Sequence, residues 1–276
     1  IVRHLADITE DKFNVDFAPI FVHSFQDSVP EVRIAALDGL WDSTDLKLIP
    51  QITTLMKQDK SEEVRAAAAA ALGHFVLLAE WGQLPEHILP GLVETLLAEY
   101  DKEDTAVSVR RVLLEGLGAA SHPRINKIIE AAYESGDQSM QISAIFAMGN
   151  SADRRWTQTV LGELENPNED MLAEAARAAG AIGSSDFVPQ LAELAYDEDL
   201  GVRIAAITSL GQIGGDQVQH ILTTMFDDPE VEEIDEVFEA VEEAMEEAVM
   251  MAGDFNFVNF SLEDEEDDEP FDEFED

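Results

Sequence analysis

The chain has 276 residues, 46% of them apolar, which is enough to bury a substantial core in one elongated or two compact domains. The absence of cysteine excludes disulfides, thiolate metal sites and thiol nucleophiles, and no apolar run approaches the roughly 18 residues of a membrane span. The formal net charge of −43 disfavours nucleic-acid binding, because phosphates need a basic surface, and favours a basic partner.

The acidity is concentrated toward the C-terminal end. Residues 227–276 contain 24 acids and no Lys or Arg, whereas the preceding residues contain 35 acids and 16 bases, a net charge of −19. Adaptation to salt or simple solubility would explain this charge as well as a basic partner does. The first residues lack a basic and apolar leader, so we expect a cytoplasmic protein without a membrane partner.

The first predicted element, residues 2–6, has the pattern of the second helix of a repeat, so residues 1–16 are interpreted as the remnant of a preceding unit. From residue 17 onward, amphipathic helices of two kinds alternate, separated by short turns rich in Asp, Ser, Gly, Asn and Pro. No sustained period-two alternation predicts a strand. The predicted first helices span 17–26, 46–57, 84–100, 124–134, 154–165, 186–196 and 216–226.

The second helices share a pattern of Val-Arg or its equivalent, then small residues, then Leu-Gly or Leu-Trp. Their residues at 0, +3, +4, +7 and +8 form one helical face, and a Gly at +9 permits close helix contact or begins the helix end. Equivalent starts fall at Val32, Val64, Val109, Met140, Met171 and Val202, at intervals of 32, 45, 31, 31 and 31.

Two parts of the repeat pattern are irregular. The interval of 45 adds about 14 residues around 73–86, which we expect to lengthen one helix and its loop and to expose Trp81 near His74. The last unit, residues 231–252, has one apolar face and one face of Glu, as expected of a capping helix that closes a stack.

Two helices repeated about every 31 residues predict an all-α fold, an α-solenoid of about seven antiparallel helix pairs in a superhelical stack over residues 1–252. An acidic tail that contains phenylalanine follows over 253–276. We expect 254–262 to pack on the last repeat through its phenylalanines, and 263–276 to be solvated or to mimic an acidic ligand.

A further pattern resembles HEAT repeats, in particular the short bacterial type and the HEAT-like repeats of bilin lyases. Pro19, Pro50 and Pro189 lie inside first helices, an Asp follows eight or nine residues later, and an Arg follows six residues after that Asp. The Asp–Arg spacing recurs in four units, as Asp27 and Arg33, Asp59 and Arg65, Asp104 and Arg110, and Asp197 and Arg203.

The resemblance implies that these residues form a structural ladder along the stack, in which each Asp caps a second helix and meets a neighbouring Arg. Such roles suit Asp as an N-cap and Arg as a partner of carboxylates. The two middle units have Ser135 with Gln141 and Asn166 with Leu172 instead, so we expect the charge ladder to be interrupted there.

No catalytic, metal or cofactor site is predicted. The six histidines form no His-x-x-x-His or His-Glu-x-x-His pair, and the absence of a His-Glu dipeptide disfavours the di-iron hydroxylases built from HEAT-like repeats. Residues 211–215 lack phosphate-loop spacing, 197–208 fail as a calcium loop, and no Gly-x-Ser-x-Gly occurs.

The second helices of a HEAT stack line its concave face, where positions +2, +5, +6 and +9 should point away from the core. An apolar stripe there would suit an amphipathic or extended peptide. For Leu37, Leu114, Ile145 and Ile207, at +5, we favour sideways packing against the next repeat. The candidate partner-binding residues are Trp41, Asp38, Arg111, Glu115, Ile142, Phe146, Thr208 and Trp81.

The leading functional hypothesis is a non-catalytic scaffold that binds a protein or peptide, most favourably a basic one, on its concave face. The alternative is an enzyme or accessory subunit similar to bilin lyases, whose repeats are also short and rich in Ala and Gly; bilin uptake on mixing would support it. A DNA glycosylase with HEAT-like repeats would need a cationic groove, which the sequence does not indicate.

Overall fold

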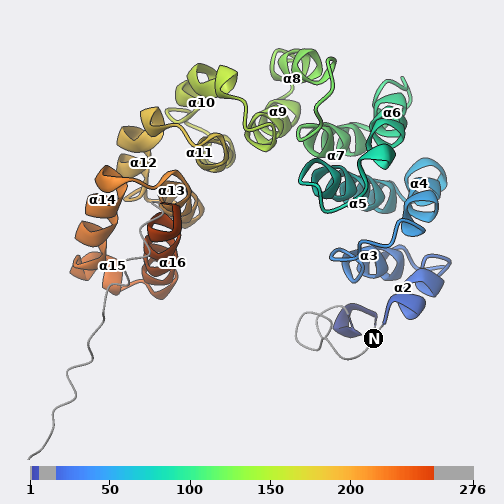
Figure 1. Ribbon diagram of the computed structural model, residues 1–276, viewed down its shortest axis with the longest axis horizontal. Coiled ribbons are helices and arrows are strands. Elements are labelled where there is room, and N and C mark those ends of the chain that lie inside the picture. Colours follow the sequence, from blue (N-terminus) through green and yellow to red (C-terminus); the bar gives the residue numbers. More distant parts are fainter. Residues whose placement is uncertain (1, 6–16, 252–276) are drawn as a thin grey trace, which may run out of the picture.

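A computed structural model describes residues 2–5 and 17–251 of the chain, and these residues form helices and turns without a strand. Helices of an outer and an inner layer alternate along an arch, so that each turn of the chain adds one helix pair (Figure 1). The predicted all-α solenoid of seven helix pairs is therefore confirmed. Residues 6–16 and 252–276 lie outside the described residues, and with them the expected packing of the tail.

The outer layer contains the first helix of each pair: α2 (Ala18–Ser24), α4 (Leu48–Gln58), α6 (Leu89–Tyr100), α8 (Ile125–Tyr133), α10 (Thr157–Glu163), α12 (Val188–Leu194) and α14 (Asp216–Phe226). The inner layer contains the second: α3 (Pro30–Asp38), α5 (Glu62–Glu80), α7 (Val107–Leu117), α9 (Gln138–Asn150), α11 (Glu169–Ile182), α13 (Leu200–Ile213) and α16 (Asp235–Met251). Short elements lie between them: η1 (Glu86–Ile88), η2 (Arg154–Trp156), η3 (Ser185–Phe187) and α15 (Pro229–Glu232).

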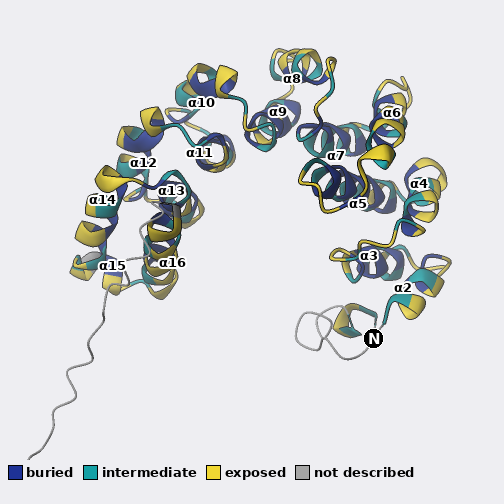
Figure 2. Cartoon of the chain, in the orientation of Figure 1, coloured by how far each residue is buried: buried dark blue, intermediate teal, exposed yellow. Residues whose placement is uncertain are grey.

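The core runs continuously between the two layers, where the buried residues lie (Figure 2). The apolar face expected of each second helix is buried, and the +5 residues pack between repeats, as expected. Leu37 is 2% exposed, and Leu114, Ile145 and Ile207 are fully buried. Because no single pair buries its own apolar face, the stack itself is the core.

Glycines at +9 let consecutive inner helices approach closely. A Cβ atom added to Gly149 would lie 2.8 Å from the Cα of Ala178 on the next inner helix, and one added to Gly211 would lie 2.8 Å from the Cα of Ala244. Since real Cβ atoms do not come this close to backbone atoms, these positions require glycine. The glycines at +9 in the sequence therefore indicate the close stacking of the inner helices.

Two irregular segments differ from the ordinary helix pair. The additional residues of the second interval, the one of 45 residues, lengthen α5 to 19 residues, as expected. The capping segment contains two helices instead of one, because the chain breaks at residues 233–234. This break allows α15 to pack on α14 while α16 packs on α13 and α14.

Candidate functional site

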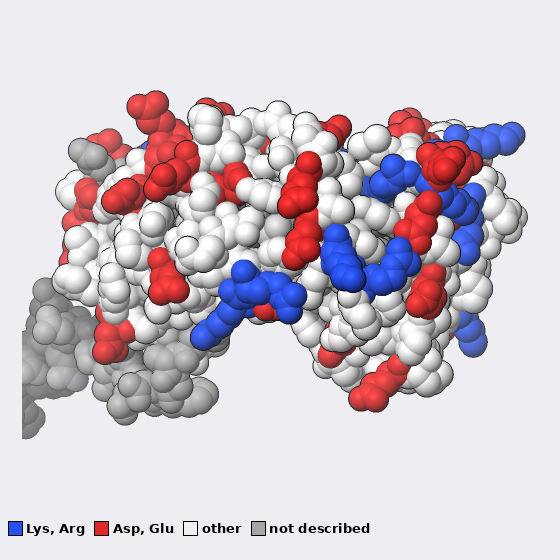
Figure 3. Space-filling model, turned by 90° about the horizontal axis from the view of Figure 1, so that it is seen from above, with Lys and Arg blue, Asp and Glu red and all other residues white. Residues whose placement is uncertain are grey.

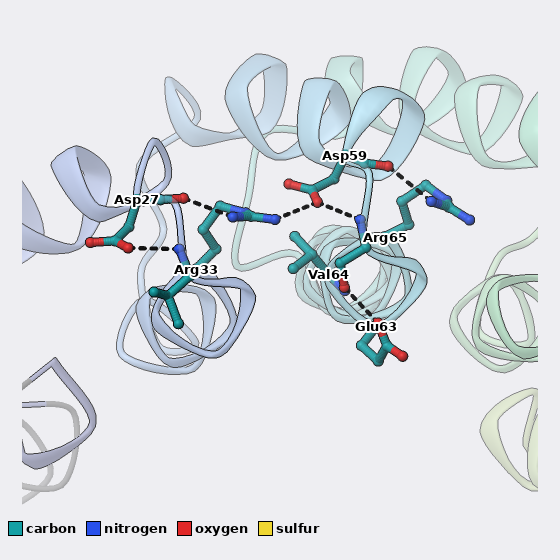
Figure 4. Close-up of polar contacts among 8 residues, drawn as sticks. Asp27, Arg33, Asp59, Glu63, Val64 and Arg65 are labelled. Carbon is teal, nitrogen blue, oxygen red and sulfur yellow. Dashed lines mark hydrogen bonds and ion pairs between the residues drawn. The ribbon is translucent and has the colours of Figure 1, made fainter.

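One arginine joins the first two helix pairs through a nearly buried ion pair (Figure 4). The Nη1 of Arg33 donates to the backbone carbonyl of Asp27 at 2.7 Å, and its Nη2 donates to the Oδ1 of Asp59 at 2.6 Å. The two paired side chains are only 11% and 7% exposed. Arg33 therefore connects its own repeat to the next one.

The other arginines of the expected ladder bind backbone carbonyls. Arg65 donates to the carbonyl of Asp59, and Arg203 donates twice to that of Asp197. Arg110 donates to the carbonyls of Tyr100 and Lys102. Among the eight ladder residues, all of them within the described ranges, Arg33 and Asp59 form the one ion pair. In the fourth unit, Gln141 donates to the carbonyl of Tyr133.

Three of the ladder carboxylates, those of Asp27, Asp59 and Asp197, close the turns that precede the second helices. Asp59 accepts the backbone N–H of Ser61, and Asp197 accepts that of Asp199. The helix then begins three residues after each ladder Asp, so a later side chain caps it: Ser61 caps α5 and Asp199 caps α13. The capping role that the resemblance implied for Asp59 and Asp197 is thus filled by their neighbours.

An aromatic pair lies where α3 ends against α5. The ring of Trp41 stacks on that of His74 with centroids 4.4 Å apart, and Trp41 is still 45% exposed. Burial lowers the pKa of His74, against the opposing charge of Asp42. Trp81, at the C-terminal end of α5, is 66% exposed. The sequence predicted Trp81 near His74, whereas the ring that stacks on His74 belongs to Trp41.

Asp38, the last residue of α3, is also partly desolvated. Asp38 is exposed, yet partial burial raises the pKa of its carboxyl above the ordinary value, against the opposing charge of Arg3. Trp41 follows Asp38 by one helical turn, and its backbone N–H donates to the carbonyl of Asp38. An acidic and an aromatic residue thus lie three positions apart at this end of the inner layer.

A groove of 710 Å³ lies on the inner layer where α7, α9 and α11 adjoin. It is wide enough to hold several side chains of a bound segment, and most of its lining is polar. The lining residues are Arg111, Asp137, Gln138, Ser139, Ile142, Asn168, Asp170, Ala173, Glu174 and Arg177.

A chain of hydrogen bonds crosses from α7 to α9 beside this groove. Arg111 Nε donates to Ser143 Oγ at 2.9 Å, and Ser143 Oγ donates to Glu115 Oε1 at 2.5 Å. On α11, Arg177 Nη1 donates to Glu174 Oε2 at 3.1 Å. The serine hydroxyl thereby fixes the orientation of the Glu115 carboxylate.

Both glutamates are partly desolvated. Burial raises the pKa of Glu115 above the ordinary value, although Ser143 and Arg111 act in the opposite direction. Burial also raises the pKa of Glu174, where Arg177 opposes the shift and the charge of Glu115 adds to it. The two carboxylates are therefore close enough to repel each other, and their neighbours do not fully compensate them.

The structure brings some of the candidate residues together. Arg111 and Ile142 line the groove, and Glu115 is linked to Arg111 through the hydroxyl of Ser143. Phe146, one turn after Ile142 on α9, is 39% exposed. The other candidates lie elsewhere on the inner layer: Thr208 is exposed on α13, while Asp38, Trp41 and Trp81 belong to the first two pairs.

Sequence reasoning missed Ser143 and Glu174, although the repeat pattern contained a sign of them. Both occupy position +3, which falls where consecutive inner helices meet. The same position holds small or apolar residues in the other units, namely Ala35, Ala67, Val112 and Ala205. Only the two middle units therefore place polar side chains there.

Charge is distributed unevenly along the arch. Seen from above, Lys and Arg gather over the middle and the N-terminal half, and Asp and Glu predominate over the C-terminal repeats (Figure 3). Arg203 is the last Lys or Arg of the chain. Exposed carboxylates on α15 and α16 include Glu232, Glu236, Glu239, Glu242, Glu243 and Glu246.

Two further properties of the described residues concern membranes and metals. None of the helices within residues 17–251 has the length and apolar character to cross a bilayer. Across residues 2–5 and 17–251, no three His, Asp or Glu side chains lie close enough together to hold a metal ion.

Comparison with known proteins agrees with the repeat pattern. The similar solved structures include human deoxyhypusine hydroxylase in complex with glycerol (TM-score 0.41, 19% identity, 84% of each chain), Escherichia coli YibA (0.47, 16%, 89% of this chain and 95% of that one) and an engineered protein (0.39, 17%, 86% and 98%). No curated protein matches the sequence. A family model of HEAT repeats matches residues 18–86 and 157–242, more than half of the chain. The chain therefore belongs to the HEAT-repeat family.

Proposed function

We propose that this HEAT-repeat scaffold binds a Lys- and Arg-rich segment of a partner protein along its inner face, without a catalytic step. The observation that carries the proposal is the composition of that face. It combines exposed aromatic rings at Trp41 and Phe146 with the partly desolvated carboxylates of Glu115 and Glu174. Aromatic anchors next to charged groups are typical of binding surfaces.

The charge of the molecule supports a basic partner. With a net charge of −43 and an acidic face on α16, the protein attracts a cationic segment over a distance of about one Debye length, roughly 8–10 Å at physiological salt. Such steering mainly raises the association rate and weakens with salt. Apolar contacts with the two aromatic rings would then supply the salt-independent part of the affinity.

The spacing of the aromatic rings bounds the size of the bound segment. Trp41 follows the first inner helix and Phe146 lies on the fourth, so three steps of about 10 Å each separate them. A segment that contacts both rings spans about 30 Å. That length corresponds to about 9 extended residues or about 20 helical residues.

A peptide selection tests the proposal. Peptides of about 20 residues, displayed as a random library, are selected on the intact protein, and the Kd of the best binder is measured by fluorescence anisotropy at low and high salt. We expect the selected peptides to be enriched in Lys and Arg. We also expect Trp41→Ser and Phe146→Ser each to weaken binding about tenfold, the typical cost of losing an aromatic anchor.

Ile20→Ser provides the matched control, because Ile20 is 46% exposed but lies on the outer helix α2. This variant should change the Kd by less than about twofold, as expected for an uninvolved surface residue. Selected peptides without a basic bias, or equal losses for the inner and outer variants, would contradict the proposal.

A further inference from the structure

We propose that the exposed face of the Trp41 indole binds the guanidinium group of an Arg in the bound segment, and that His74 positions the indole by stacking on its opposite face. This inference rests on the proposed function and deepens it, because it names the chemical group that the aromatic end of the inner layer recognises. It also distinguishes Arg from Lys, which the charge of the chain alone does not.

The first argument is the position of Trp41 within the repeat. Trp41 occupies position +9, where the other five units hold glycine, namely Gly73, Gly118, Gly149, Gly180 and Gly211. A Cβ atom added to any of these glycines would lie 2.4–2.8 Å from an atom of the next inner helix. The first unit instead places the largest side chain at this position, after α3 has ended at Asp38. The close stacking of the inner helices therefore does not account for the tryptophan.

The second argument is the way in which the indole is held. Its ring stacks on the imidazole of His74 with centroids 4.4 Å apart and an angle of 25° between the planes, and Trp41 is still 45% exposed. Because the imidazole covers one face of the indole, the exposed area belongs to the opposite face and to the ring edge. Among the residues that the structure describes, the stack thus leaves one flat aromatic face open to a ligand.

The third argument is the charge around the ring pair. Asp38 and Asp42 flank Trp41 in the sequence, and both are exposed. Asp42 lies close enough to the pair for its charge to raise the pKa of His74 against the larger effect of burial. The opposing cation is Arg3, whose charge acts on Asp38. Two carboxylates against one guanidinium give a local charge of −1, which complements a cation rather than an anion.

His74 supports the indole without competing with a cation. Burial lowers the pKa of His74 below its ordinary value of 6.5, so the imidazole is largely uncharged at neutral pH. A neutral ring on one side of the indole leaves the negative face of its π system to attract a positive group from the other side.

A guanidinium group suits this surface better than an ammonium group. It is planar and weakly hydrated, so it can lie flat on an aromatic ring while its N–H groups point outward to carboxylates at the ring edge. The compact ammonium group of Lys is strongly hydrated and has no flat face. We therefore expect Trp41 to bind Arg about two- to fivefold more tightly than Lys, the range of one exposed contact between a cation and an aromatic ring.

The test follows the tryptophans of the full chain by ¹⁹F NMR after labelling with 5-fluorotryptophan. The chain has three tryptophans, Trp41, Trp81 and Trp156, and replacing each in turn with Phe assigns their resonances. Capped tripeptides with Arg, Lys or citrulline between two glycines are titrated at neutral pH and constant ionic strength. We expect a saturable shift of the Trp41 resonance with Arg and weaker binding of Lys. Citrulline has the shape of arginine without its charge and should shift nothing. Trp81, which is 66% exposed, is the internal control.

Four variants make the assignment specific. His74→Ala removes the supporting ring and should weaken the Arg tripeptide several-fold, whereas His74→Phe retains a ring and should restore the affinity. Asp42→Asn should weaken binding about two- to fivefold, as expected for an exposed charge pair. Glu130→Gln removes the same charge from an exposed position on the outer helix α8 and should leave the affinity unchanged. Circular dichroism of each variant checks that the stack stays folded, so that a loss of affinity is not a loss of structure.

Equal affinities for the Arg and Lys tripeptides, or an equal shift with citrulline, would overturn the guanidinium site. A shift at Trp81 as large as that at Trp41 would indicate unspecific attraction and would overturn it as well. An affinity unchanged in His74→Ala would show that His74 does not position the indole.

The outcome is separable from that of the proposed function. If selected peptides bind the inner face but the Arg tripeptide does not shift the Trp41 resonance, the guanidinium site is wrong and the scaffold proposal stands. If the selection yields no basic peptide while Trp41 prefers the Arg tripeptide, the scaffold proposal is wrong and the guanidinium site stands.

Discussion

Arg33 shows how one side chain couples neighbouring repeats. Replacing it with Ala removes the ion pair and leaves the Asp59 carboxylate nearly buried without its cation. We expect Arg33→Ala to lower the free energy of unfolding by about 3 kcal/mol, the usual cost of breaking a buried pair. Chemical denaturation followed by circular dichroism measures it.

Arg124→Ala is the matched control, because Arg124 pairs with Asp101 where both side chains are about half exposed, at 47% and 48%. Exposed pairs contribute at most about 1 kcal/mol, so the loss should be correspondingly small. Equal losses for the two variants would mean that Arg33 does not couple the repeats.

The Glu174 carboxyl predicts a pH dependence. Burial raises its pKa in the folded protein above the ordinary value of 4.5, so the folded state binds the proton more tightly than the unfolded chain. Stability is then fully present below the unfolded pKa and is lost as the pH rises through the folded pKa. Glu174→Gln removes this loss.

The variant should therefore be more stable than the parent protein at neutral pH and closer to it at acidic pH. Urea denaturation of both proteins at the two pH values measures the difference. A variant that is less stable than the parent at neutral pH would show that the contact with Arg177 outweighs the desolvation of the carboxylate.

At the scale of helices, the space around two glycines predicts opposite effects of replacing them with alanine. A Cβ on Gly149 would lie 2.8 Å from the Cα of Ala178, whereas one on Gly162 in α10 meets nothing within 4 Å. Gly149→Ala should destabilise the protein by about 1–3 kcal/mol through overpacking. Gly162→Ala should stabilise it by about 0.5–1 kcal/mol, because alanine favours the helix.

Thermal unfolding of the two variants tests both expectations. The Tm should fall for Gly149→Ala and rise slightly for Gly162→Ala. A Tm that is unchanged by Gly149→Ala would show that α9 and α11 are farther apart in solution than the stack requires.

The sequence predicted most of the fold because the helix pairs repeat with a regular period. Apolar spacing gave the helix pairs, and the interval of 45 gave the long α5. The sequence did not predict the break between α15 and α16, because apolar spacing continues through residues 231–252. It also missed the stacking of Trp41 on His74, which depends on how α3 meets α5 rather than on either helix alone.

The candidate site was predicted only in part, for the same reason. The helical periodicity of the second helices placed Arg111, Ile142 and Phe146 on the inner layer. The hydrogen bonds from Arg111 through Ser143 to Glu115 connect α7 with α9. The repulsion between Glu115 and Glu174 acts between α7 and α11. Such contacts follow from the stacking geometry, which a single sequence does not contain.

At the scale of the whole molecule, the chain forms an arch (Figure 1) with an aromatic end, a mixed-charge middle and an acidic end, which agrees with the proposed binding of a long basic segment along the inner layer. The absence of cysteine makes single-cysteine labelling unambiguous. Gln138, which lines the groove on α9, and Gln158, which lies on the outer helix α10, are both exposed and form a matched pair of positions.

The most direct test of inner-face binding is photo-crosslinking of a selected basic peptide to Gln138→Cys and Gln158→Cys, each labelled with the same photoreactive group. The account predicts a strong crosslink at residue 138, lost on competition with unlabelled peptide, and only background at residue 158. A crosslink at residue 158 equal to or stronger than that at residue 138 would contradict it.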